Sequence, residues 1–181
     1  MCIRDSLTSV LMHAEVDGEK LEEHEIVMGF FLLVAAGNDS TKATYCSGMR
    51  ALIENPDQMR LVAEDPSLIP GAVEESLRMF PAFAHFRRTA SCDTELHGQK
   101  IKAGEKVVMW YVSSNRDETR FEDPDRFDVR RWSNRGSSPE ASVSRARSDH
   151  QAFGAGGRHF CLGTALARLE RIDPARFDLR W

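Results

Sequence analysis

The feature that most constrains the fold is an apolar run of eleven residues, Ile26 to Ala36, counting Gly29. Glu22 and Glu23 precede this run, and a helix dipole favours acidic side chains in the first turn. A helix that is apolar on every face has to be buried by other parts of a protein. Because a membrane-spanning helix needs about 20 apolar residues, the run predicts a buried core helix and no membrane span.

A polar segment, Gly37 to Ser40 (GNDS), follows the apolar run directly. Local rules predict that the helix stops at Gly37, which would act as its C-cap. The alternative is that Asp39 and Ser40 stand inside a continuing buried helix, where polar groups need a specific reason. Helical spacing resumes after this segment and ends at Asn55, the residue before a proline.

The rest of the chain predicts a mainly α-helical fold with a small β region. Helical spacing or a helix-start signal marks three further segments, residues 7–14, 57–65 and 69–78. Short strands are predicted at residues 94–98 and 106–112, with a turn at Ala103 and Gly104 between them. Loops are predicted at Val16 to Gly18 and at the serine- and arginine-rich residues 133–149.

The composition excludes several classes of protein. Of the 181 residues, 41% are hydrophobic and 29% are charged, as in ordinary globular domains. The net charge of −4 argues against a nucleic-acid partner, which a basic stripe would indicate. Residues 1–6 lack the apolar segment of a secretory signal, so we expect a cytoplasmic protein with reduced cysteines. Cys2, Cys46, Cys92 and Cys161 form no CxxC pair, which argues against a zinc ribbon.

One cysteine stands in a context that suggests metal chemistry. Phe153 to Gly163 is a glycine-rich segment that contains Cys161 and leads into a helix-forming sequence. A helix N-terminus stabilises a thiolate, and neighbouring glycines let a flat ligand approach the backbone. The segment contains neither GxGxxG nor GxxxxGK, so it does not predict a nucleotide site. Taken alone, Cys161 could equally be a buried and inert thiol.

Two further features, an ion pair on a helix and a proline-containing loop, indicate a function only together with the polar segment at 37–40 and the cysteine segment. Glu75 and Arg78 share a helix face at i, i+3 spacing, which alone predicts an exposed ion pair. Pro124 to Phe127 (PDRF) lies between this pair and Cys161, and alone it predicts a loop.

In this order and spacing, the four features resemble the cytochromes P450, the haem-thiolate monooxygenases. Trp110 to Glu118 (WYVSSNRDE) and Phe86 to Ala90 (FRRTA) resemble soluble bacterial members that hydroxylate terpenoids, fatty acids or steroid side chains. The resemblance covers residues 7–171, whereas residues 1–6 and 172–181 do not match. It implies the C-terminal, haem-ligating half of the family fold, and therefore a fragment.

The resemblance also implies a haem site around Cys161, whose thiolate would be the axial ligand of the iron of haem b. Phe153 would pack beside this thiolate, in the loop that includes Gly154. His159 and Arg88 stand where the family binds the haem propionates. A buried ion network behind the haem would consist of Glu75, Arg78 and Arg126.

The interrupted helix gains a role from the same resemblance. Asp39 and Ser40 would be the acid–alcohol pair that delivers protons for oxygen activation, and Ala36 and Gly37 would open the helix groove over the haem. The residues implied in the substrate pocket are Leu32, Ala35, Ala82, Phe83 and Ala84.

Two departures from the family pattern are visible. Phe153 stands eight residues before Cys161, where the commonest family pattern has seven, and some lipid- and steroid-oxidising members share the longer spacing. Ser40 stands where threonine is usual, which keeps the hydroxyl and loses the methyl group that restricts χ1.

The implied reaction is insertion of one oxygen atom from O2 into an apolar small molecule, with electrons from a ferredoxin or reductase. Two alternatives are a haem-binding module without oxygenase activity and a truncated reading frame without function. A thiolate-type spectrum of the reduced protein under CO would separate a haem site from the last alternative.

Overall fold

The computed structural model describes residues 7–133, 149–154, 161, 163 and 164. Outside these residues lie His159, the C-terminal boundary predicted at residue 171 and all of the predicted loop at residues 133–149 except its two end residues. The chain divides into two compact units, Met1–Lys42 and Ala43–Trp181.

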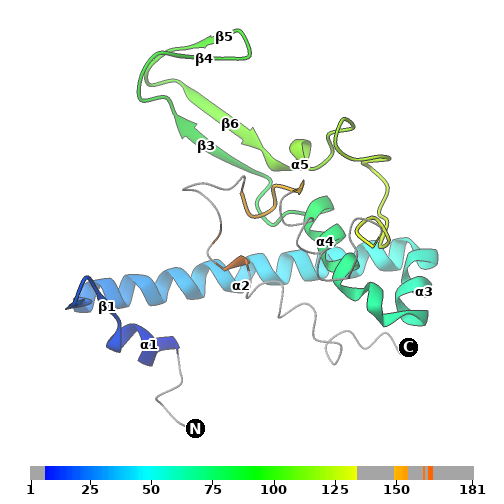
Figure 1. The fold of residues 1–181 in the computed structure, drawn as a ribbon, viewed down its shortest axis with the longest axis horizontal. Helices are drawn as coiled ribbons and strands as arrows, with labels where there is room; N and C mark the ends of the chain where they lie inside the picture. Colours follow the sequence, from blue (N-terminus) through cyan, green and yellow to red (C-terminus); the bar gives the residue numbers. More distant parts are fainter. Residues whose placement is uncertain (1–6, 134–148, 155–160, 162, 165–181) are drawn as a thin grey trace. The chain divides into compact units, whose positions relative to one another are not determined.

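Helices dominate the described residues and three small antiparallel sheets accompany them, which confirms the predicted fold class (Figure 1). The helices are α1 (Leu7–His13), α2 (Glu23–Glu54), α3 (Pro56–Glu64), the 3-10 helix η2 (Pro66–Leu68), α4 (Ile69–Met79) and α5 (Tyr111–Ser114). The strands are β1 (Glu15–Val16), β2 (Glu19–Lys20), β3 (His85–Thr89), β4 (Thr94–Leu96), β5 (Gln99–Ile101) and β6 (Lys106–Trp110).

Helix α2 continues through the polar segment, so the predicted stop at Gly37 is wrong. The side chain of Ser40 explains part of this continuity, because its Oγ donates to the carbonyl of Ala36 at 2.6 Å. A serine that bonds back by four residues satisfies its hydroxyl inside the helix instead of ending it. At the start of α2, the Glu25 carboxylate accepts the backbone N–H of Glu22 at 2.9 Å, as in one arm of a capping box.

The apolar run of α2 is exposed, and the prediction that it is buried is wrong for the described chain. Phe31 and Leu32 expose 64% and 63% of their surface. The apolar sequence of this run shows that its side chains need other residues to cover them, but it does not show that the described chain contains those residues. Among the described residues, no helix combines the length and hydropathy needed to cross a membrane.

Two tight turns shape the smallest sheets. Asp17 and Gly18 have φ values of 55° and 85°, and His97 and Gly98 have φ values of 48° and 78°. Two-residue hairpin turns of type I′ need positive φ at both central positions, which glycine adopts readily. Residues 17 and 18 of the predicted loop at 16–18 are therefore the turn of a β1–β2 hairpin, whereas Val16 belongs to β1. The second turn joins β4 to β5.

The longest strand pair is β3 with β6, which runs from His85 opposite Trp110 to Thr89 opposite Lys106. Strand β3 is missing from the sequence prediction because every one of its residues is exposed and no apolar alternation marks it. The predicted strand at residues 106–112 is confirmed only to Trp110, since Tyr111 begins α5.

The hydrophobic core of the second unit surrounds α4. It contains Ala51, Leu52, Val62, Leu68, Ile69, Ala72, Val73, Leu77, Met79, Phe127 and Val129. A smaller cluster consists of Phe121 and Trp132, whose rings meet edge to face at 6.2 Å. Helix α4 therefore has apolar neighbours over most of its surface, and its charged residues have to be satisfied inside the protein.

One glycine of α4 is required by close packing, which makes a stability prediction possible. A Cβ atom at Gly71 would lie 2.7 Å from the carbonyl oxygen of Val129, and a backbone atom cannot move aside cheaply. We expect Gly71→Ala to lower the free energy of unfolding by about 1–3 kcal/mol through overpacking, measured by urea denaturation.

Gly37 provides the matched control, because no described atom lies within 4 Å of a Cβ built there. Gly37→Ala should stabilise α2 by up to about 1 kcal/mol, because alanine is the better helix former. Equal effects of the two substitutions would contradict the proposed role of Gly71.

Candidate functional site

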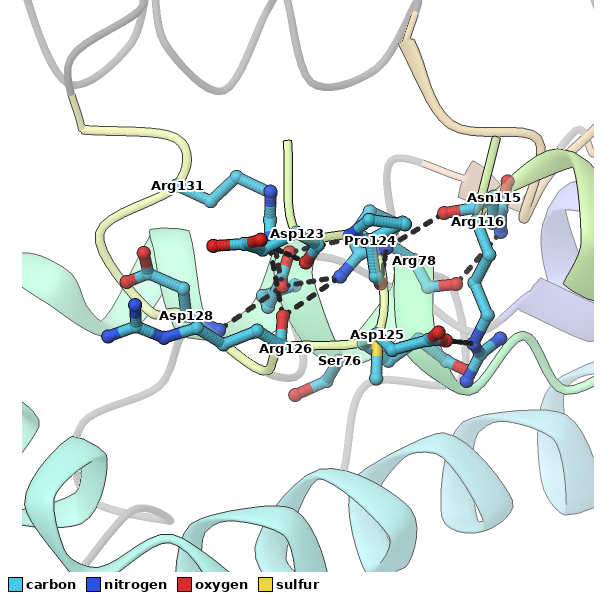
Figure 2. Close-up of polar contacts among 12 residues, drawn as sticks. Ser76, Arg78, Asn115, Arg116, Asp123, Pro124, Asp125, Arg126, Asp128 and Arg131 are labelled. Carbon is cyan, nitrogen blue, oxygen red and sulfur yellow. Dashed lines mark hydrogen bonds and ion pairs between the residues drawn. The ribbon is translucent and has the colours of Figure 1, made fainter. Parts of the chain in front are cut away.

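Arg78 is the centre of the site, and the protein binds every N–H group of its side chain. Its Nε and one Nη2 hydrogen pair with the two carboxylate oxygens of Glu75 at 2.9 and 2.7 Å. The remaining three hydrogens bind backbone carbonyls, those of Asn115 at 2.8 Å, Pro124 at 2.7 Å and Arg126 at 3.3 Å (Figure 2). A guanidinium carries five N–H donors, so all of them are satisfied although Arg78 has no exposed surface.

Glu75 is buried as completely as Arg78 and accepts additional hydrogen bonds. Its Oε1 accepts the Nε–H of Arg131 at 3.0 Å and the backbone N–H of Asp128 at 3.2 Å. Two guanidinium groups therefore share one carboxylate in the interior. A buried carboxylate needs this degree of pairing, because the transfer of an unpaired charge out of water costs several kcal/mol.

The second arginine of the network is Arg131 and not Arg126, which corrects the sequence prediction. The side chain of Arg126 is exposed, and Arg126 contributes only its carbonyl, which also accepts from Nη2 of Arg131 at 2.9 Å. The side chain of Arg131 is only 7% exposed and donates to the carbonyls of Glu122 and Asp123 as well. Arg131 therefore binds the turn that Arg126 belongs to.

Asn115 is a member of the network that the sequence did not reveal. It has no exposed surface, and its Nδ2 donates to the carbonyl of Arg78 at 3.0 Å. Its Oδ1 accepts the backbone N–H of Gln151 at 2.6 Å. Asn115 thus connects the end of α4 to the segment that leads toward Cys161.

Gln58 joins α3 to the same region. Its Oε1 accepts the backbone N–H of Val129 at 3.0 Å, and its amide donates to the Asp57 carboxylate at 2.8 Å. This side-chain hydrogen bond is the main reason why the pKa of Asp57 lies below its ordinary value.

A tight turn precedes the cysteine. The N–H of Gly154 donates to the carbonyl of Gln151 at 3.0 Å, and Gly154 has a φ of 96°, which favours glycine. The carbonyl of Phe153 then accepts the N–H of Cys161 at 2.8 Å. The backbone of Cys161 is therefore fixed to a residue eight positions earlier, while its thiol is exposed. Phe153 also packs against the hydrophobic core.

A second buried pair, Glu74 of α4 and His150 at the start of this segment, is also not predicted by the sequence. Nε2 of His150 is 2.8 Å from Oε2 of Glu74. The available signal was Glu74 itself, a carboxylate next to apolar residues on a helix, because a buried polar group of this kind requires a partner.

The predicted residues of α2 lie in the first unit. Five of them follow one another at helical spacing along one face, namely Leu32, Ala35, Ala36, Asp39 and Ser40. Gly37 is about 100° around the helix from Ala36. Asp39 is exposed and Ser40 is half-buried.

The remaining predicted residues lie between α4 and β6. Arg88 is an exposed residue of β3, and its Nη1 donates to the neighbouring carbonyl of Arg87 at 3.1 Å. Ala82, Phe83 and Ala84 are exposed in the connection from α4 to β3, and the carbonyl of Ala84 accepts the N–H of Tyr111 at 2.9 Å.

The described residues of the network and of the cysteine segment differ in chemical character. The groups around Glu75 and Arg78 bind one another and are buried, so they are suited to holding the fold rather than to reacting with a ligand. Cys161 instead presents a sulfur donor at the surface, and a thiolate is a ligand for soft metals and haem iron. The chemistry of this donor fits a haem group.

Comparisons with known proteins agree on one family. The family model described as Cytochrome P450 matches residues 2–171. A steroid C26-monooxygenase of Mycobacterium tuberculosis (strain CDC 1551 / Oshkosh) is 43% identical over 166 residues, which cover 92% of this chain and 41% of the relative. A methyl-branched lipid omega-hydroxylase of Mycobacterium bovis is 45% identical over 177 residues, which cover 97% of this chain and 38% of the relative.

The fold is also similar to that of solved structures. The ligand-free structure of cytochrome P450 TbtJ1 superposes with a TM-score of 0.81 at 39% sequence identity, and the match covers 97% of this chain and 43% of that chain. The chain thus spans about two fifths of the length of the proteins it matches.

The different roles of the two arginines generate a prediction. Arg131→Ala should lower the free energy of unfolding by about 3 kcal/mol, because it leaves the buried Glu75 carboxylate with one partner fewer. Arg126→Ala should stay within about 0.5 kcal/mol of the parent, because only its carbonyl is used. Urea denaturation of both variants gives the comparison, and a larger loss for Arg126→Ala would contradict the network as described.

Proposed function

Because the chain belongs to the cytochrome P450 family, we propose that it is the haem-ligating part of a monooxygenase. The whole protein would insert one oxygen atom from O2 into a C–H bond of an apolar small molecule. When bound, the haem would supply the oxygen chemistry, and its thiolate ligand would favour O–O cleavage. The residues of this chain would hold the haem, orient the substrate and move protons.

One observation carries this proposal, the placement of Cys161. Its thiol is exposed, and its backbone N–H is bound by the carbonyl of Phe153 at 2.8 Å. A ligand to iron has to present its sulfur at a fixed position, and this hydrogen bond restricts the backbone that carries it. Cys46 and Cys92 are also exposed thiols, but they lie in α2 and in the β3–β4 connection.

The other haem contacts follow from the family resemblance. Arg88 and His159 would bind the propionates, and the exposed guanidinium of Arg88 has the charge that this role needs. Phe153 and Gly154 would form the wall of the thiolate loop. Ala36 and Gly37 would leave room for the haem at α2, and the open space around Gly37 supports this assignment.

The same face of α2 would carry the proton path. Asp39 is exposed and would take protons from solvent, and Ser40 stands beside it. The Oγ–H of Ser40 donates to the carbonyl of Ala36 at 2.6 Å. A hydroxyl group can both donate and accept hydrogen bonds, so Ser40 would orient a proton-carrying water. Asp39 and Ser40 would then act as the acid and the orienting hydroxyl.

An apolar substrate is supported by the pocket residues and by the relatives. Leu32 and Ala35 on α2 and residues 82–84 would line the pocket, and Leu32 is 63% exposed in the described chain. Relatives bear the names steroid C26-monooxygenase and methyl-branched lipid omega-hydroxylase. We therefore propose a steroid side chain, a fatty acid or a terpenoid as the substrate class.

The proposed partners are O2 and an electron donor, either a ferredoxin or a reductase. We place the whole protein in the cytoplasm and assign it no nucleic-acid partner, in line with its net charge of −4.

The first test concerns the ligand. Protein that contains this chain, loaded with haem, reduced and exposed to CO, should show the red-shifted Soret band of thiolate ligation. Cys161→Ala should abolish this band, whereas Cys92→Ala, the control at another exposed thiol, should retain it. The opposite pattern would refute Cys161 as the ligand. Turnover with a surrogate electron donor then separates a monooxygenase from a haem-binding module.

The second test concerns proton delivery in the same haem-loaded protein. Asp39→Asn should slow turnover by about 10²–10⁴-fold, the usual contribution of a general acid or base, and leave haem binding intact. Ser40→Ala should mainly release peroxide, because the orienting hydroxyl is lost. The measurement is the product formed per electron consumed.

Thr41 is the matched control for Ser40, because its hydroxyl lies about 100° further around the helix. Thr41→Ala should leave the ratio of product to electrons unchanged. If Thr41→Ala uncouples the reaction and Ser40→Ala does not, the assignment of the hydroxyl is off by one residue.

A further inference from the structure

The pair of Glu74 and His150 is the second buried polar contact of α4. Both side chains are only 1% exposed, and Nε2 of His150 lies 2.8 Å from Oε2 of Glu74. The two residues are 76 positions apart in the sequence, so the contact joins α4 directly to the segment that precedes Cys161. The carboxylate that pairs with Arg78 is Glu75, whereas the carboxylate that pairs with His150 is Glu74.

The hydrogen bonds of His150 identify its tautomer. The backbone N–H of Ala152 points to Nδ1 of His150 at 3.3 Å, and a backbone N–H can only donate. Nδ1 therefore accepts and carries no proton. The ring proton is then on Nε2, which donates to the carboxylate of Glu74. Both ring nitrogens are used, one toward α4 and one toward the following turn.

The surroundings of the ring allow little rotation. Trp132 meets the His150 ring edge to face, with centroids 5.9 Å apart, and Trp132 is itself only 1% exposed. The next residue, Gln151, is held through its backbone N–H by Oδ1 of Asn115 at 2.6 Å. Two consecutive residues are thus bound to buried side chains, which fixes both the position and the direction of the chain at this point.

The fixed segment leads to Cys161 through two further hydrogen bonds. The turn from Gln151 to Gly154 is closed by a bond of 3.0 Å, and the carbonyl of Phe153 in this turn accepts the N–H of Cys161 at 2.8 Å. The path from α4 to the cysteine backbone therefore consists of the Glu74–His150 pair, one turn and one hydrogen bond. A rotation of the His150 ring would move the turn and, with it, the acceptor of the Cys161 N–H.

We propose that Glu74 and His150 are positioning residues for the thiolate ligand, which they hold in place from α4 through the turn at residues 151–154. The proposal rests on the proposed function in one respect, the assignment of Cys161 as ligand. The hydrogen bonds of the pair are directional, so they fix the turn in a way that apolar packing of the same ring against Trp132 does not.

The test compares two substitutions that separate hydrogen bonding from packing. His150→Gln keeps an amide N–H that can donate to Glu74, whereas His150→Phe keeps an aromatic ring against Trp132 and loses both nitrogens. The first measurement is hydrogen exchange of the Cys161 backbone amide, which requires no haem. We expect His150→Phe to accelerate this exchange by about tenfold or more and His150→Gln to stay closer to the parent, because only His150→Phe removes every hydrogen bond of this side chain.

The second measurement is the fraction of reduced, CO-bound protein that shows the thiolate-type Soret band, in the haem-loaded protein. This fraction should fall in His150→Phe and be largely retained in His150→Gln. Leu68→Ala is the control, because Leu68 is a buried core residue of η2 that makes neither hydrogen bond. It should lower the overall stability and leave the Cys161 exchange relative to other core amides unchanged.

The outcomes separate this proposal from the proposed function. Faster Cys161 exchange in His150→Gln than in His150→Phe would overturn the positioning role, since packing and not hydrogen bonding would then hold the turn. The positioning role would also be overturned if Leu68→Ala accelerated the exchange of the Cys161 amide, relative to other core amides, as much as His150→Phe does. Absence of the thiolate band in the parent protein would refute the proposed function, whereas the order of exchange rates would still decide whether the pair positions Cys161.

Discussion

The buried guanidinium of Arg78 is the interaction on which the second unit depends. Its five donors bind one carboxylate and three backbone carbonyls, so one side chain joins α4 to the residue after α5 and to the turn at residues 124–126. A charge in this position is tolerated only because each donor has an acceptor. The chain from residue 115 to residue 131 therefore has to follow a path that brings three carbonyls to this cation. The apolar core then packs around α4.

Neighbouring carboxylates of α4 serve different segments. Glu75 binds Arg78 and Arg131 and so holds the residues around 122–131, while Glu74 binds His150 and so holds the residues before Cys161. Side chains at adjacent positions of a helix point about 100° apart. Glu74 and Glu75 can therefore bind segments that lie on two different sides of α4. Asn115 connects the two sides, because it contacts both the carbonyl of Arg78 and the N–H of Gln151.

The sequence predicts the short-range ion pair of α4 and fails to predict the long-range partners. The pairing of Glu75 with Arg78 follows from their spacing on one helix, and the helices around them follow from local signals. The choice of Arg131 over Arg126 does not follow, because both arginines lie in the same irregular segment and only the folded path decides which side chain turns inward. The sequence does not predict a role for His150 for the same reason, because its partner Glu74 lies 76 residues away.

The sequence separation of these contacts also implies an order of folding. The Glu75–Arg78 pair spans three residues and can form as soon as α4 is helical, whereas the bonds from Arg78 to Pro124 and from His150 to Glu74 span 46 and 76 residues. Closing long loops costs chain entropy before any contact compensates for it. Arg78 thus has its carboxylate partner before its carbonyl partners reach it. The segment before Cys161 is among the last parts of the second unit to take its place.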